Sequence, residues 1–293
     1  MEPSYERNVV VGVDGSPESL VAARYALWQA ELRGLDVLLV YSYPLPLMDV
    51  PVSTTFIDDF RTAGLTVLAD AVAALEVPPS VALTTEVAET LPAHLMQEMS
   101  RSAPLVVVGQ HATAWYDRLG RGSVASPLAH HSGCPVVVVP PSWRQHAQDG
   151  RPVVVALDGE VSSTDALAYA FEEAALIGTE VVALHAVPDG AAGRSGVAER
   201  NIAVLLADAG AAHPGTTSRV VSERGDARRV ILVAARTAAV LVVGPPHTEG
   251  LALWTSSVAR RVMTSVECPM VVVPRRRHLH STTPAPPELL VAS

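Results

Sequence analysis

Two stretches of the chain carry closely similar runs of residue types, and this internal repeat constrains the fold more than any other feature. Residues 9–31 read VVVGVDGSPESLVAARYALWQAE, and residues 153–175 read VVVALDGEVSSTDALAYAFEEAA. Asp14 aligns with Asp158, and towards the end of each copy Cys134 aligns with Cys268. A chain built from two similar halves is expected to fold as two domains of the same architecture.

The second copy is the shorter of the two. It lacks residues after its second predicted strand, where the first copy carries PLPLMDVPVSTTF. The total of 293 residues suits two domains of common size. We expect a first domain over 1–141, a polar linker bounded by prolines over 142–151, a second domain over 152–274 and a disordered tail over 275–293.

The predicted strands are continuous aliphatic runs such as VLLV and VVVV, not alternating patterns. Such runs are typical of parallel strands whose two faces are both covered by helices. Each copy reads as five strands with helices between them, and only 4% of the residues are aromatic, so Ala, Val and Leu must fill the core. The sequence therefore predicts an α/β fold: two doubly wound, five-stranded parallel-sheet domains in tandem.

Charge and hydropathy disfavour several classes of partner. With 30 acidic and 21 basic residues the formal charge is −9, which repels nucleic acid, and the basic run 275–277 reads as part of a solvated tail. No stretch approaches the roughly 20 apolar residues of a membrane helix, and the N-terminus does not resemble a signal peptide. We expect a cytoplasmic protein without membrane contact, in which Cys134 and Cys268 are buried free thiols.

In a doubly wound sheet the ligand crevice lies beyond the carboxyl ends of the strands, where the strand order reverses. Asp14 ends the first predicted strand there, before a helix that starts at Gly15-Ser16-Pro17. Its carboxylate could accept a hydrogen bond from an adenine amino group or a ribose hydroxyl. Alternatively, Asp14 only caps the helix.

The loop after the fourth predicted strand is the more specific candidate. Gly109 leaves that strand, and Gly122-Ser123 opens a helix whose free N–H groups and positive dipole end could hold phosphate. A Gly-Ser pair is also an ordinary helix start, so this segment taken alone leaves both interpretations open.

These segments resemble the universal stress protein family, whose nucleotide-binding members carry G-x2-G-x9-G-[ST] after the fourth strand and an Asp after the first. The resemblance runs from about residue 8 to 274 and implies an adenine nucleotide alpha hydrolase-like, Rossmann-like fold. It implies that Asp14 and the main chain of Ser42 face adenine, and that Gly109, Gly122 and Ser123 hold ribose and phosphates. The ligand implied is ATP or a related adenine nucleotide, with Mg as a possible companion. The candidate binding residues of the first repeat are Gly12, Asp14, Ser42, Gly109, Ala112, Gly122, Ser123 and Val124.

Departures from the family pattern separate the two repeats. Ala112 replaces the second motif glycine, which would cost about 1 kcal/mol if that position needs a positive φ. In the second repeat Gly244 matches the first motif glycine, but the second and third become His247 and Ser256, and two prolines stiffen the loop. We expect a degenerate second site, with weaker equivalents at Asp158, Ala186, Gly244, Ser256 and Ser257.

The sequence offers no catalytic constellation. His130 and His131 are adjacent and lack a third ligand at suitable spacing, so we expect no metal site, and no P-loop motif occurs. No general base or activated nucleophile is apparent, which favours a regulatory binding protein that is at most a very slow ATPase. The alternatives are a scaffold module that binds no nucleotide and, less favoured, a weak ATPase or kinase-like enzyme.

The closing strands of the repeats, at 135–140 and 269–274, read PVVVVP and PMVVVP. In the family this strand lies at the sheet edge and pairs antiparallel with its counterpart. Since a linker raises the local concentration of one repeat for the other to around the millimolar range, we expect an intrachain pseudo-dimer. Any further homodimer would use other surfaces.

Overall fold

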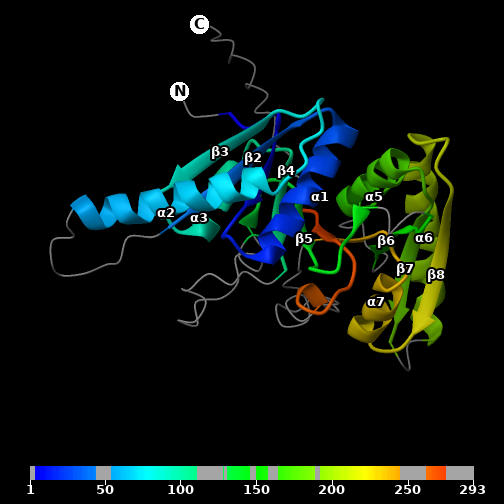
Figure 1. Cartoon of the computed structure of the whole chain (residues 1–293). Coiled ribbons are helices and arrows are strands. Elements are labelled where there is room, and N and C mark those ends of the chain that lie inside the picture. The colour runs from blue at the N-terminus through cyan, green and yellow to red at the C-terminus, as the bar shows by residue number, and fades with distance from the viewer. Residues whose placement is uncertain are drawn as a thin grey trace, which may run out of the picture.

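The computed structural model describes residues 4–43, 54–110, 128, 131–145, 150–157, 164–188, 192–244 and 262–274. Within these ranges the two halves of the chain follow the same order of strands and helices (Figure 1). The strands of the first half are β1 (Asn8–Gly12), β2 (Asp36–Ser42), β3 (Leu83–Ala88), β4 (Leu105–Gly109) and β5 (Val136–Val139); its helices are α1 (Pro17–Arg33), α2 (Thr54–Ala73) and α3 (Pro92–Met99). The strands of the second half are β6 (Val153–Ala156), β7 (Val181–Val187), β8 (Ser218–Arg224), β9 (Val240–Val243) and β10 (Met270–Val272); its helices are α5 (Thr164–Ile177), α6 (Ala192–Ala211) and α7 (Ala227–Ala235).

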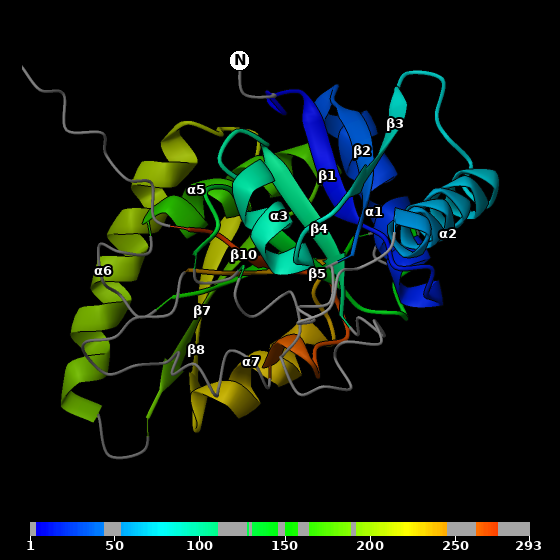
Figure 2. The ribbon, with the colours of Figure 1, turned by 90° about the vertical axis from the view of Figure 1, so that its left-hand side faces the viewer.

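The ten strands of the described residues form one sheet in the order β3-β2-β1-β4-β5-β10-β9-β6-β7-β8. Every neighbouring pair inside each half is parallel, as the aliphatic strands predict. Both views place β3 with α2 at one end of the molecule and β8 with α6 at the other (Figures 1 and 2). The predicted α/β fold with two doubly wound repeats in tandem is confirmed.

The two halves join where β5 pairs antiparallel with β10. Val271 lies opposite Val137, and Met270 and Val272 lie opposite Val138 and Val136. Val137 and Val271 hold equivalent positions in the two repeats, so a pseudo-twofold axis passes between them. The intrachain pairing expected from the closing strands is therefore present.

Helices cover both faces of the sheet. One face carries a buried cluster to which α1, α2, α5 and α6 contribute, and the opposite face carries a second cluster containing residues of α3 and α7. Alternate residues of a strand enter opposite clusters, as Val9 and Val10 of β1 do. Strands such as β5 and β9 are continuously apolar because each of their side chains, on whichever face it lies, is buried.

The length difference between the repeats falls in the predicted place. In the first repeat β2 ends at Ser42 and α2 begins at Thr54, whereas in the second β7 ends at Val187 and α6 begins at Ala192. Both helices have 20 residues. The shorter second copy thus has a shorter connection between its second strand and second helix, and the same framework.

Trp143 ties the segment after β5 to the first repeat. Although the sequence places it in a polar linker, its side chain is only 4% exposed. Its rings meet Tyr25 edge-on at a centroid distance of 5.1 Å and lie 5.8 Å from Trp28, both on α1. Such aromatic contacts add to area burial, so the first part of the interdomain segment belongs to the core.

The two cysteines are buried and free, as predicted. Burial raises the pKa of each thiol from its ordinary value to about 12. Both thiols therefore stay protonated and unreactive near neutral pH.

We predict that replacing both Val138 and Val272 with proline weakens the seam between the repeats. Proline has no N–H to donate and is poorly tolerated inside a sheet. The expected result is faster proteolysis between residues 145 and 151 than in a variant with alanine at the same two positions, which keeps both donors. Equal cleavage rates of the two variants would show that the strand pairing does not hold the repeats together.

Candidate functional site

The strand order of the first repeat reverses between β1 and β4. From β1 the chain proceeds outward through β2 and β3, then returns to add β4 and β5 on the other side of β1. Gly12 ends β1, Ser42 ends β2 and Gly109 ends β4, and these three strands are neighbours. Parallel strands end at a common edge, so these predicted site residues come together at the switch point, where doubly wound sheets bind ligands.

The turn after β1 is organised by hydrogen bonds that include Asp14. Gly15 adopts a φ of +83°, which favours glycine. The Asp14 carboxylate accepts from the Ser16 N–H at 3.0 Å and also from the Ser16 hydroxyl. Ser16 in turn is the N-cap of α1, and its oxygen accepts from the Ser19 N–H at 3.1 Å. The cap is thus Ser16, and half-buried Asp14 positions it.

The main-chain N–H and C=O groups of Ser42 point to the β1 side of the strand, beyond the point where β1 ends. Val40 accepts from the Val13 N–H at 2.9 Å on the β1 side, whereas Tyr43 donates on the β3 side. Since successive strand residues direct their peptide groups to alternate sides, those of Ser42 point the same way as those of Val40, past the last residue of β1. The Ser42 hydroxyl is held separately, donating to the carbonyl of Thr90.

Gly109 lies against the first turn of α1. A Cβ at this position would come within 3.2 Å of the carbonyl carbon and oxygen of Glu18. Glycine therefore lets β4 pack closely on α1, and a larger residue would push the start of α1 aside by a few tenths of an ångström. A Cβ at Gly12 would make ordinary contacts, the nearest at 3.6 Å from Met96.

Gln110, which the sequence analysis overlooked, connects this edge to the second repeat. Its side chain is only 6% exposed, and its amide donates to the carbonyls of Met263 at 2.8 Å and Val266 at 2.9 Å. Its own N–H donates to Val139 of β5 at 2.9 Å. A glutamine directly after a buried strand was the available signal, but its partners, more than 150 residues away, were not visible in the sequence.

Comparison with known proteins identifies the family. The model of the universal stress protein family matches residues 6–140 and again 150–274. The chain belongs to the universal stress protein family.

Several relatives of this universal stress protein span nearly its whole length. A universal stress protein of Mycobacterium tuberculosis is 30% identical over 286 residues, covering 90% of this chain and 95% of the relative. A second one from the same organism is 29% identical over 296 residues, covering 92% and 98%. The crystal structure of a universal stress protein from Archaeoglobus fulgidus, 17% identical, has the same fold with a TM-score of 0.69 over 93% of this chain and 98% of that one.

Some predicted site residues lie outside the described part of this universal stress protein. In the second repeat, Ala186 is buried in β7 and Gly244 directly follows β9. His185 is buried beside Ala186, with its Nδ1 3.2 Å from the carbonyl oxygen of Leu157. The predicted residues outside the described ranges are Ala112, Gly122, Ser123 and Val124 in the first repeat and Asp158, Ser256 and Ser257 in the second.

Metal binding and membrane insertion are two further functions on which the described residues bear. No group of three or more His, Cys, Asp and Glu side chains within these residues is placed to hold a metal ion. No helix found in the same residues is long and apolar enough to cross a membrane.

We predict that Gly109→Ala lowers the free energy of unfolding by about 1–2 kcal/mol, because its methyl group would press on the main chain of α1. Gly244→Ala is the matched control, since no described atom lies within 4 Å of the Cβ position there. Urea unfolding of both variants measures the difference. Equal stabilities would mean that α1 moves aside at no cost.

Proposed function

We propose that this protein is a regulatory adenine-nucleotide-binding protein, and that ATP binds at the switch point of its first repeat. The observation that carries the proposal is the meeting of Asp14, the Ser42 main chain and Gly109 at one sheet edge. The chain that follows Gly109 has the spacing of the family's nucleotide motif, with Gly122 and Ser123 in place. Adenine would lie near Asp14 and Ser42, and the phosphates near Gly122 and Ser123.

Gln110 supports a regulatory role for the bound nucleotide. It stands between Gly109 and Ala112, inside the motif, while its amide is held by two carbonyls of the second repeat. A nucleotide that rearranges the segment after Gly109 would therefore act on residues 263–266, which lead into β10. Ligand binding would then change contacts across the seam, because the nucleotide would bind one arrangement of the segment after Gly109 more tightly than the other.

The same geometry keeps a scaffold function as the second candidate. Close packing against Glu18 already favours glycine at 109. The Asp14 carboxylate already has a role in the turn that caps α1. A repeat that had lost nucleotide binding could retain both residues for these reasons. ATP binding therefore distinguishes the scaffold function from the regulatory one.

We predict one ATP per chain in calorimetry, because the second repeat has His247 and Ser256 in place of the second and third motif glycines. Gly122→Val should abolish binding by filling the space that a phosphate would occupy, while the circular dichroism spectrum stays unchanged. Two equivalent sites, or retained affinity in this variant, would contradict the placement. No binding by the parent protein would favour the scaffold.

We predict that Ala112→Gly raises the affinity for ATP by up to roughly five-fold, because about 1 kcal/mol of backbone strain is relieved. Calorimetry under the same conditions measures the change. Unchanged or weaker binding would show that alanine fits its backbone conformation at this position and that the family glycine is not required here.

A further inference from the structure

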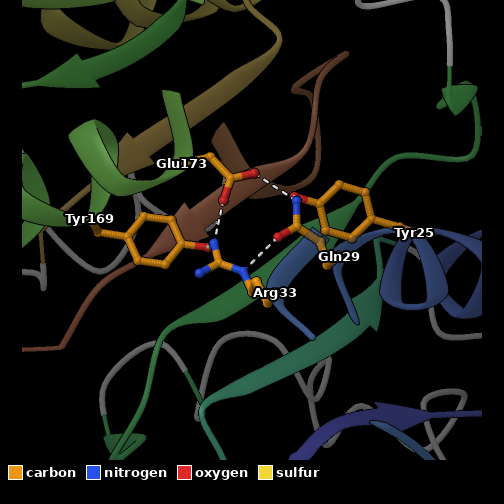
Figure 3. A network of polar contacts seen from close by, with 5 residues as sticks. All are labelled: Tyr25, Gln29, Arg33, Tyr169 and Glu173. Carbon is orange, nitrogen blue, oxygen red and sulfur yellow. Dashed lines mark hydrogen bonds and ion pairs between the residues drawn. The ribbon is translucent and has the colours of Figure 1, made fainter. Parts of the chain in front are cut away.

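The two repeats also meet through helices α1 and α5, where a buried polar network crosses the seam (Figure 3). Gln29 and Arg33 reach it from α1, and Glu173 reaches it from α5. The side chains of Gln29 and Glu173 are fully buried. Polar groups in such a place are costly unless each has a partner, so their pairing decides whether the repeats can meet.

Each group of this network is paired across or along the helices. The Gln29 amide donates to Oε1 of Glu173 at 2.6 Å, and Arg33 forms an ion pair with Oε2. The Nε of Arg33 donates to Oε1 of Gln29 at 2.9 Å, which closes a triangle (Figure 3). One cation thus faces one carboxylate, and the amide bridges them.

Two tyrosines frame the triangle. Tyr25 lies near the Gln29 amide, with 3.3 Å between Nε2 and the phenol oxygen. The Tyr169 hydroxyl accepts from Arg33 at 3.3 Å, and the guanidinium lies 5.4 Å from the centre of the Tyr169 ring. Burial raises the pKa of both phenols, so they remain neutral and add no charge to the seam.

The frame is symmetric, but the charges are not. Gln29 and Glu173 stand 144 residues apart and occupy equivalent positions of the two repeats, as do Tyr25 and Tyr169. The same spacing places Ile177 in the second repeat where the first has Arg33. The pseudo-twofold axis therefore relates a neutral amide to a carboxylate, and a cation to an apolar side chain.

This asymmetry penalises pairing between like repeats. Two second repeats joined by the same axis would bring Glu173 against Glu173, with Ile177 where a cation is needed. Two first repeats would place two Gln29 side chains together and leave two Arg33 guanidinium groups without a carboxylate. An uncompensated buried charge is strongly destabilising, whereas the mixed pair balances its charges.

The edges of β5 and β10 by themselves do not distinguish a pair of like repeats from a pair of one first and one second repeat. The closing strands read VVVV in β5 and MVV in β10, and all seven residues are buried. Main-chain pairing between such similar aliphatic edges favours no particular combination. Selectivity between alternative partners is commonly supplied by polar groups that are satisfied in only one of them.

We propose that Gln29, Arg33 and Glu173 make the seam selective for one first repeat with one second repeat, and close it to a second copy of either repeat. The partner that this surface accepts is a complementary repeat, which the same chain supplies. The inference is independent of nucleotide binding.

The first experiment tests the charge pairing in the full chain. Q29E brings a second carboxylate to the network, as two second repeats would, and E173Q leaves Arg33 without a carboxylate, as two first repeats would. In Q29E/E173Q the carboxylate moves to α1, four residues before Arg33 and next to Gln at 173. We expect each single variant to lower the melting temperature and the double variant to recover most of the loss. Additive losses would overturn the proposed pairing.

The second experiment measures partner choice, using Val137 and Val271, which face each other across the axis. Directly opposed residues of antiparallel strands lie within disulfide reach. In a Cys134→Ala/Cys268→Ala background, V271C alone reports contact between second repeats of two chains, V137C alone reports contact between first repeats, and V137C/V271C reports the native pair. Each protein is refolded from urea at high concentration and then oxidised.

We expect V137C/V271C to form a disulfide within one chain. Adding E173Q to V271C removes the facing carboxylates and should increase disulfide-linked dimers about ten-fold or more. Adding E173Q to V137C should increase them far less, because it only weakens the native pair and two Arg33 groups still lack a carboxylate. If V271C alone links as well as V271C/E173Q, or if E173Q promotes linkage equally at both positions, the seam is merely loosened and the proposal is wrong.

Discussion

The antiparallel pairing of β5 with β10 is the contact on which the rest of the molecule depends. Each repeat by itself would end in a strand of buried valines with unpaired main-chain groups along one side, an edge that invites uncontrolled pairing. Joining the two edges makes one ten-stranded sheet and continues both helical layers across the axis. The pseudo-twofold arrangement follows, because equivalent valines face each other at the centre.

Around this apolar centre lie buried polar side chains whose hydrogen-bond partners belong to the other repeat. Glu173 and Arg33 meet beside Gln29 on one face of the sheet. Gln110 donates to the carbonyls of Met263 and Val266, which belong to the buried cluster on the opposite face. Buried polar groups add little net stability, since desolvation offsets much of their attraction. Their effect is to fix one arrangement among many that an aliphatic seam would allow.

The candidate nucleotide site is built on the same framework. Its residues end β1, β2 and β4, whose positions are set by the covered sheet, and Gly109 brings β4 against the start of α1. Because Gln110 follows Gly109 directly and contacts the second repeat, the site and the seam share neighbouring residues. A protein of this construction can connect occupancy of a small-molecule site with the arrangement of its two halves.

The sequence by itself determined the repeat, the parallel α/β architecture and the convergence of the Asp14 and Gly109 segments, because aliphatic periodicity, glycine placement and strand ends are local signals. The pairing of the closing strands and the place of Ser42 in the site were expected from the resemblance to the family. The sequence placed Trp143 in a polar linker, overlooked Gln110 and gave no sign that Gln29, Arg33 and Glu173 meet. These contacts join residues more than 100 positions apart, or depend on which helix face turns toward the axis. Only the tertiary structure decided them, since a polar side chain in a helix pattern shows the same letter whether it meets water or a buried partner.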